Sequence, residues 1–337
     1  MPRKPLLMLN PHEYEHEYDK MALDSLNKIP GLKIYSKFYL KYDIEKQYKI
    51  LNTGSSIKVT PTHFPEIHQI LEEACRNIHL THIPDLYIQR GWEINASTTG
   101  REQPLIMISS GAVEYLTSEE LLCVVGHEAG HIKSGHTLYS NMARTISMLG
   151  ESIIDSLWGI GGYVQSNVEQ ALNLWSQMSE FTSDRAGLLA CQDKEVAISV
   201  LMKLSGVPPK LYDKMDTGEF IEQASEFKSF DSDALDKMYK EYFKLGRDHP
   251  WGVLRASEIL KWADEGKYQH IIDIHSEENI DNIDETCLEC GNKLKSDETF
   301  CGICGSKRWE QICPKCGNQI KGDEGFCGEC GKKLWRR

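Results

Sequence analysis

The sequence predicts an α+β protein in which a mainly helical domain carries a small β-sheet and is followed by a small cysteine-rich domain. Apolar residues recur at helical spacing in several segments of the first part, which is typical of helices that pack on a core. Three short segments between residues 86 and 108 have the length and composition of strands. Eight of the 11 cysteines lie after residue 286 and indicate a separate metal-binding module.

We expect an acidic segment to separate the two parts. Residues 1–275 form the first domain, with its core at about residues 60–262, and residues 287–337 form the cysteine module. Between them, residues 276–286 are rich in Asp and Glu and contain no Lys or Arg. Such unbalanced charge favours a solvated linker over a packed element.

The helices and strands of the first domain can be placed approximately from periodicity. The expected strands are residues 86–89, 92–98 and 105–108, and the expected helices are residues 67–78, 118–134, 172–190 and 195–205. The second helix has the clearest ends, because Thr117 and Glu120 form a capping box before it and Gly135 can stop it. The segment between residues 136 and 180 could be a lid, a membrane-touching element or a packing helix, and the sequence does not distinguish these three.

The helix over residues 118–134 carries His127, Glu128 and His131 in the pattern H-E-x-x-H. Two histidines four positions apart lie on one helix face, at a separation that allows both to bind one zinc ion. Glu128, between them, is then free to transfer a proton. The alternative is a helix with two half-exposed histidines and a solvated glutamate, which would require the pattern to have arisen by chance. The pattern predicts a metal-dependent peptide hydrolase with Glu128 as its catalytic base.

A catalytic zinc ion needs a third protein ligand and keeps one position open for water. Glu180 is the candidate, and Asp184 follows it at the spacing that places both on one helix face. Alone, such a pair is usually a solvated face. Together with the upstream motif, it predicts that Glu180 joins His127 and His131 on the zinc, while Asp184 accepts the N–H of a ligand histidine.

The cysteines of the C-terminal module form two sets, and each member of the second lies 26 positions after its counterpart. The first set is Cys287, Cys290, Cys301 and Cys304, and the second is Cys313, Cys316, Cys327 and Cys330. Each pair is followed by glycine, which permits a tight turn around the metal. Redox-active C-x-x-C pairs are the alternative, but they usually occur singly beside a βαβ unit. The repeat resembles a double zinc ribbon and predicts two structural zinc ions that supply much of its folding energy.

Composition limits the class of protein and of partner. The content of 40% hydrophobic and 26% charged residues is ordinary for a soluble globular protein, and the formal net charge of −12 argues against nucleic acid as main partner. The apolar patch at residues 6–9 is too short for a signal peptide, and residues 145–164 contain charges and glycines. We therefore expect an amphipathic or buried helix there, with peripheral membrane contact left open. Metal-binding cysteines indicate a reducing compartment, so the expected location is the cytoplasm.

The ribbons are expected to bind a protein partner, recruit substrate or regulate the first domain. From residue 287 to 337 there are ten Lys and Arg against seven Asp and Glu, and zinc-bound thiolates bring this module close to neutrality. The aromatic side chains of the module could stack on bases, but they could equally pack its small core. Near-neutral charge favours a protein partner over nucleic acid.

Several short motifs of the first domain follow one another in an order known from one family. They are Asn95-Ala96, residues 108–111, Glu120-Leu121, the H-E-x-x-H motif, residues 179–186, His249-Pro250 and Arg255. Over about residues 30 to 262 the chain resembles the gluzincin metallopeptidases that include the HtpX heat-shock protease and the CaaX prenyl protease. The resemblance implies a zincin-like domain in which His249 stabilises the oxyanion and Arg255 orients the site. The alternative to a role for His249 is a proline turn at Pro250, and the alternative for Arg255 is a surface ion pair.

We expect a zinc-dependent endopeptidase that hydrolyses unfolded or flexible protein segments through a zinc-activated water, in protein quality control. The resemblance places the strand of Asn95, Ala96 and Ser97 beside the cleft, where an extended substrate can pair with it. One catalytic and two structural zinc ions are expected. The alternative is an interaction scaffold in which the ribbons act and the protease domain is silent or gated, but the complete ligand set argues against a silent domain.

Overall fold

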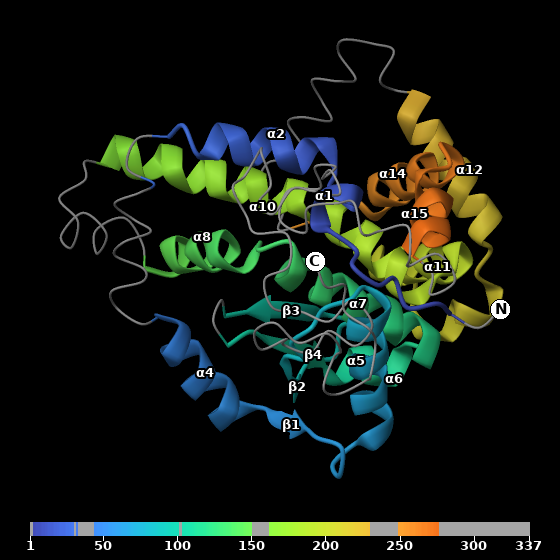
Figure 1. Ribbon diagram of the computed structural model, residues 1–337, viewed down its shortest axis with the longest axis horizontal. Coiled ribbons are helices and arrows are strands. Elements are labelled where there is room, and N and C mark those ends of the chain that lie inside the picture. Colours follow the sequence, from blue (N-terminus) through green and yellow to red (C-terminus); the bar gives the residue numbers. More distant parts are fainter. Residues whose placement is uncertain are drawn as a thin grey trace, which may run out of the picture.

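The computed structural model describes residues 3–29, 32, 44–100, 103–149, 162–229 and 249–275. Within these ranges the chain is mostly helical and contains one small sheet (Figure 1). The predicted α+β class of the first domain is therefore confirmed. The expected linker and the eight cysteines of the C-terminal module lie outside the described residues.

The sheet has four strands in the order β1-β2-β4-β3. They are β1 (Ile57–Val59), β2 (Asp85–Gln89), β3 (Ala96–Thr99) and β4 (Leu105–Ser109). Strands β2 and β4 are parallel, whereas β1 pairs with β2, and β3 with β4, in antiparallel fashion. Strand β4 is buried along its whole length, as its uninterrupted apolar sequence requires. Strand β3 is an edge strand, because its outer side pairs with no other strand of the described chain.

The strand expected over residues 92–98 begins later than predicted, at Ala96. Ser109 at the end of β4 explains the difference. Its hydroxyl donates to the carbonyl of Glu93 at 2.6 Å and accepts the N–H of Asn95 at 3.0 Å. These side-chain bonds satisfy backbone groups that would otherwise need a strand ladder, so the chain forms a loop before β3.

Helices surround the sheet and form most of the core. They are α1 (Pro11–Tyr14), α2 (Glu17–Leu26), α4 (Ile44–Ser55), α5 (Pro65–Asn77), α6 (Ser110–Tyr115), α7 (Ser118–Lys133), α8 (Thr137–Leu149), α10 (Gly162–Cys191), α11 (Lys194–Leu204), η1 (Pro209–Lys214), α12 (Thr217–Ser229), α14 (Gly252–Asp264) and α15 (Lys267–His275). The predicted helices match α5, α7 and α11 to within two residues, and the helix expected over residues 172–190 is the second part of the longer α10. In Figure 1, α2 and α8 lie on opposite sides of α10.

Helices α7 and α10 approach closely because glycines of α7 face alanines of α10. A Cβ atom added at Gly126 would lie 2.2 Å from the Cβ of Ala190, and one added at Gly130 would lie 2.4 Å from the Cβ of Ala186. Side-chain atoms do not approach this closely, so only glycine permits this helix separation. Since α7 carries the H-E-x-x-H motif and α10 the third expected ligand, the glycines set the distance between the two halves of the site.

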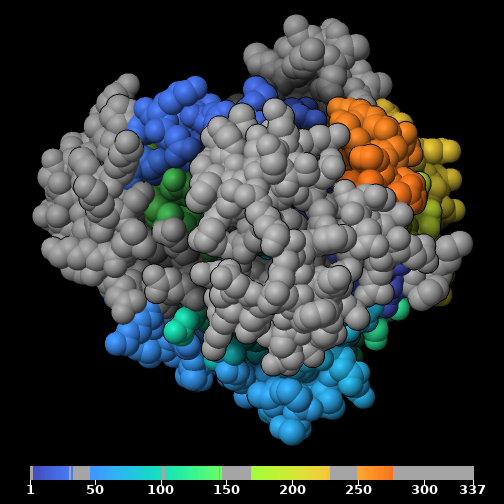
Figure 2. All heavy atoms as spheres, in the orientation of Figure 1, coloured from blue at the N-terminus to red at the C-terminus, as the bar shows by residue number. Residues whose placement is uncertain are grey.

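The described part of the segment between residues 136 and 180 packs on the rest of the protein. Met142 of α8, together with Leu172 and Trp175 of α10, forms a buried cluster with Leu26 of α2. On the other side of the molecule, α14 packs against both α12 and α15, and Figure 2 shows the orange surface of α14 and α15 beside yellow surface. No helix within the described ranges combines the length and apolar content needed to cross a bilayer.

A partly buried histidine between the N-terminal segment and α5 should make the fold sensitive to acid. His79 accepts the backbone N–H of Met8 on Nδ1 at 3.1 Å, and Lys133 donates to the His79 carbonyl at 2.9 Å. Burial, followed by the charge of Lys133, lowers the pKa of His79 from 6.5 to about 4. The unfolded chain therefore binds a proton near pH 6.5 that the native protein rejects until about pH 4. The free energy of unfolding should fall across this window by up to about 3 kcal/mol and be independent of this group above it.

Denaturant unfolding of the wild type and of His79→Asn between about pH 7 and pH 4 measures this effect. Asparagine is the replacement because residue 79 has a φ of 53°, which asparagine tolerates better than most residues. We expect the wild type to lose more stability than the variant as the pH falls. Equal losses would show that His79 does not carry the acid sensitivity.

Candidate metal centre

Both histidines of the H-E-x-x-H motif project from one face of α7. The helix starts where expected, since Thr117 Oγ1 accepts the N–H of Glu120 at 3.2 Å and Glu120 Oε2 accepts the N–H of Thr117 at 2.8 Å. It ends before Gly135, which has a φ of 73°. On this helix the Nε2 atoms of His127 and His131 lie 3.1 Å apart. Their ring positions are those that the spacing in the sequence predicts.

Glu180 of α10 completes a group of three side chains that can hold a metal ion. Its Oε1 lies 3.3 Å from His131 Nε2, and its Oε2 lies 3.5 Å from His127 Nε2. One ligand atom from each residue lies within 4.8 Å of the others, and the described ranges hold no second group of this kind. Two imidazoles and one carboxylate are a donor set of catalytic zinc sites. The structure thus brings the three expected ligands together.

The surroundings of Glu180 also fit a cation. The residue is 5% exposed, and its Oε2 accepts no hydrogen bond from the described groups. Nitrogen atoms of His249, His127 and Arg255 lie 3.0, 3.5 and 3.6 Å from this oxygen. Burial raises the pKa of Glu180, but His249, followed by the other imidazoles, brings it well below its ordinary value. The carboxylate is therefore ionised, as metal binding requires.

Asp184, one turn after Glu180, contacts the first histidine of the motif. Its Oδ1 lies 3.0 Å from His127 Nδ1, while Arg255 donates to both carboxylate oxygens, with Nε at 2.8 Å from Oδ2. Burial raises the pKa of Asp184, but the charge of Arg255 lowers it to about 2. An ionised Asp184 accepts the Nδ1–H of His127, which leaves the lone pair of Nε2 facing Glu180. Arg255 is 8% exposed and reaches the site through Asp184, so it is not a surface ion pair.

Thr98 holds Glu128 and was not anticipated from the sequence. Its hydroxyl donates to Glu128 Oε2 at 2.6 Å, and both residues are buried. Thr98 follows Ser97 on β3, and the alternation of a strand points it to the opposite face. The alternation of the strand predicts that Thr98 and Ser97 face opposite sides of the sheet. It does not predict that α7 brings Glu128 beside Thr98.

The residues expected to bind substrate lie at the edge of the sheet. Asn95 is exposed and precedes β3, while Ala96 and Ser97 are its first two residues and are partly exposed. Because β3 pairs with β4 on one side, its outer side has the geometry for the addition of an extended peptide. Helix α7 packs against β3, so this edge lies near the motif.

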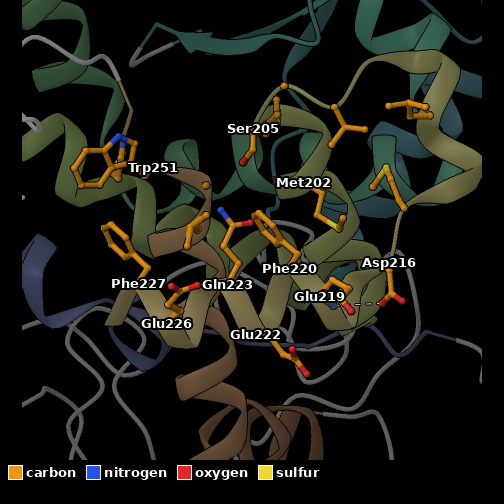
Figure 3. Close-up of a pocket in the computed structure, with 18 of the residues that line it drawn as sticks. Met202, Ser205, Asp216, Glu219, Phe220, Glu222, Gln223, Glu226, Phe227 and Trp251 are labelled. Atoms are coloured by element: carbon orange, nitrogen blue, oxygen red, sulfur yellow. Dashed lines mark hydrogen bonds between the residues drawn. The ribbon is translucent and has the colours of Figure 1, made fainter. Parts of the chain in front are cut away.

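His249 lies between the metal centre and an open groove. Its Nδ1 is 3.0 Å from Glu180 Oε2, yet its side chain is 56% exposed. The groove has a volume of about 1650 Å³ and runs between α11, η1, α12 and the start of α14. Figure 3 shows Phe220 and Gln223 of α12 lying across from Met202. His249 is thus placed where a substrate in the groove would meet the metal centre.

Comparison with known proteins agrees with this geometry. The family model of peptidase family M48 matches residues 61–263, and that of the double zinc ribbon matches residues 284–332. The first span contains the motif, Glu180, Asp184, His249 and Arg255. The second contains all eight cysteines of the two predicted sets.

Individual relatives differ in how much of the chain they cover. The plastoglobule-localized metallopeptidase 48, chloroplastic, of Arabidopsis thaliana is 32% identical over 272 residues, which are 80% of this chain and 78% of that protein. A protease HtpX homolog of Sulfurovum sp. (strain NBC37-1) is 32% identical over 112 residues, 33% of this chain and 40% of the relative. Protease HtpX of Xylella fastidiosa (strain 9a5c) is 29% identical over 118 residues, 34% of this chain and 40% of the relative. The likeness to these two HtpX proteins is confined to less than half of each.

Proposed function

This chain belongs to peptidase family M48, and we propose that it is an endopeptidase that cleaves unfolded or flexible protein segments at the centre on α7 and α10. The predicted resemblance to HtpX-like metallopeptidases is confirmed, and with it a zinc-dependent protease. The C-terminal double zinc ribbon is likewise confirmed. The observation that supports the active site is the convergence of ligand atoms from His127, His131 and Glu180 within 4.8 Å.

The residues around this centre divide the chemistry between them. When held by His127, His131 and Glu180, zinc supplies a Lewis acid that polarises the scissile carbonyl and activates water. Glu128 takes a proton from the attacking water and passes it to the leaving nitrogen. Because the Thr98 hydroxyl holds Oε2 of Glu128, we assign the proton transfer to Oε1.

Three further residues orient the metal ligands or stabilise the charge that develops during hydrolysis. Asp184 fixes the ring of His127, and Arg255 fixes Asp184 through two hydrogen bonds. His249 stabilises the developing oxyanion, with Nε2 as the ring atom that faces substrate because Nδ1 lies beside Glu180. Together with the ribbons, this assignment requires one catalytic and two structural zinc ions per chain.

The substrate should lie extended across the site. Pairing with the edge strand β3 supplies main-chain hydrogen bonds on one side of the scissile bond. The groove beyond His249 accommodates side chains on the other side. Its lining combines apolar side chains with more carboxylates than lysines, which favours apolar and basic substrate residues. The carboxylates are Asp216, Glu219, Glu222 and Glu226, and the lysine is Lys214. A folded chain cannot present such a free strand, which supports a role in protein quality control.

Filling the groove should weaken the binding of long substrates. Gln223→Trp places an indole in the space that Figure 3 shows beside Phe220. We expect KM for an unfolded protein to rise on the order of tenfold, or about 1.4 kcal/mol, with kcat for a short peptide unchanged. Ser225→Trp is the matched control, since Ser225 is exposed on the same helix and does not line the groove. An equal KM in both variants would exclude the groove as part of the substrate site.

The substrate class is tested with one protein in two states. A disulfide-bonded globular protein is offered in its native form and after reduction and alkylation, which removes the fold and keeps the sequence. We expect kcat/KM for the unfolded form to be higher by roughly 100-fold or more, because cleavage of the native form requires local unfolding. Similar rates for both forms would contradict the proposed preference.

The same assay separates the roles of the ribbons. We infer that they recruit substrates or partners, a role supported by their near-neutral charge and their separate match to a ribbon family. Removal of residues 287–337 should then leave hydrolysis of a short peptide unchanged and slow the digestion of the unfolded protein. Altered peptide hydrolysis would favour gating, and no proteolysis in either form would favour an interaction scaffold.

A further inference from the structure

We propose that Asp19 and His136 are positioning residues for His131, so that a helix outside the family match completes the metal centre. Asp19 lies on α2, whereas the match to peptidase family M48 begins at residue 61. The inference rests on the proposed function, because it takes His131 as a zinc ligand.

The three side chains form a continuous chain of contacts in the interior. His131 Nδ1 lies 3.0 Å from His136 Nδ1, and His136 Nε2 lies 3.1 Å from Asp19 Oδ2. Asp19 is 2% exposed, His136 4% and His131 9%. Water therefore does not compete for these contacts, and each hydrogen bond constrains the next.

The direction of the hydrogen bonds follows from what each group can donate. A carboxylate oxygen accepts, so the His136 nitrogen that faces Asp19, Nε2, carries a proton. With His131 Nε2 taken as the zinc ligand, the proton of His131 lies on Nδ1, which donates to its partner nitrogen. His136 Nδ1 is then an acceptor, and the nitrogen 3.0 Å away, His131 Nδ1, must donate to it. This leaves His131 Nε2 with its lone pair, and that atom lies beside His127 and Glu180. Asp19 thereby selects the tautomer of His131 that can bind a metal.

Both partners of His131 are themselves held in place. Thr182 Oγ1 donates to Asp19 Oδ2 at 2.7 Å and accepts the backbone N–H of His16 at 3.0 Å. Thr182 lies on α10, the helix that carries Glu180, and Figure 1 shows α2 lying along it. The rings of His136 and Trp175 pack in a T-shaped arrangement, with ring centroids 5.5 Å apart and an angle of 84° between the planes. These contacts hold Asp19 and His136, the two residues that support His131, in their orientations.

The two histidines of the motif are supported in different ways. His127 is held directly by Asp184, which belongs to the family span. His131 is held through an intermediate imidazole by a carboxylate from the N-terminal segment. Loss of Asp19 should therefore affect the metal centre although the residue contacts no metal ligand.

Histidine tautomers in the wild-type protein test the chain of hydrogen bonds directly. Two-bond ¹H–¹⁵N spectra of the zinc-loaded full chain, with ¹⁵N-labelled histidine, distinguish protonation at Nδ1 from protonation at Nε2. We expect His136 to be protonated at Nε2 and His131 at Nδ1. A proton on His136 Nδ1 would overturn the proposal, and this measurement needs no variant to fold.

Zinc retention tests whether Asp19 supports metal binding by His131. The variant Asp19→Asn replaces a pure acceptor by an amide that can also donate, so it no longer selects one tautomer. The control Glu258→Gln alters a second buried histidine–carboxylate pair, in which Glu258 Oε2 lies 3.2 Å from His16 Nε2, without touching a ligand. In dialysis against graded zinc buffers, Asp19→Asn should weaken retention of the catalytic zinc about 10- to 100-fold relative to that control. Equal retention in the two variants would overturn the proposal.

A third variant separates failure of this inference from failure of the proposed site. His131→Ala should lose one zinc per chain in the same dialysis, while the zinc of the ribbons is common to all variants. If His131→Ala retains all its zinc, the proposed metal centre is wrong. If His131→Ala loses one zinc and Asp19→Asn behaves like the control, the centre stands and only the role of Asp19 fails.

Discussion

Replacement of Glu128 by glutamine should slow peptide hydrolysis by orders of magnitude while the zinc stays bound. The carboxylate is the proton acceptor for the attacking water, and an amide of the same shape cannot take that proton. Glutamine still accepts the Thr98 hydroxyl bond that holds Oε2 in the wild type. We expect kcat to fall by about 10²- to 10⁴-fold, with an unchanged zinc content and little change in KM.

The matched control is Glu119→Gln on the same helix. The side chain of Glu119 is 51% exposed, pairs with Arg3 and takes part in none of the contacts described at the metal centre. Activity, zinc content and thermal stability are measured for both variants. Wild-type activity in Glu128→Gln would rule out Glu128 as the base, whatever the metal content.

Replacement of Glu180 by glutamine should remove the catalytic zinc itself. The change deletes the anionic ligand and leaves the Arg255 guanidinium beside a neutral side chain. We expect zinc affinity of this site to fall by more than about 100-fold, and activity to fall with it. Asp184→Asn is the graded comparison, because Asp184 touches a ligand and not the metal, and a loss of about 10- to 100-fold is expected.

Zinc per chain, measured after dialysis, distinguishes the two variants. Glu180→Gln should fall short of the wild type by one zinc at a zinc concentration where Asp184→Asn still retains part of it. If Glu180→Gln keeps the full zinc content and activity, the third ligand is a different residue.

Local features of the sequence predicted the helices and the three side chains that the structure brings together, because both follow largely from helix geometry. The spacing of His127 and His131 places both on one face, and the capping box at Thr117 fixes where α7 starts. Glu180 could be selected because Asp184 follows it one turn later and because the upstream motif lacks a third ligand. Each of these inferences uses residues within a single helix plus one chemical requirement.

Contacts between segments that are distant in the sequence could not be predicted from helix and strand periodicity. Thr98 meets Glu128, and Asp19 meets His136, only because β3 and α2 pack against the helices of the site. No periodicity links such positions. The strand before Ala96 was predicted too long for a related reason, since the hydroxyl of Ser109 takes over backbone groups from a loop that is distant in sequence. The glycines of α7 and the alanines of α10 were both visible in the sequence, but their pairing across the two helices was not.

The most direct test of the metal centre is anomalous diffraction at the zinc edge from crystals of the zinc-loaded full chain. We predict one peak at about 2.0–2.2 Å from the Nε2 atoms of His127 and His131 and from a carboxylate oxygen of Glu180, with no fourth protein ligand. Zinc peaks at the ribbons alone, with none at this position, would contradict the assignment of this centre as the hydrolytic site. A peak here whose coordination is closed by a fourth side chain would contradict it as well.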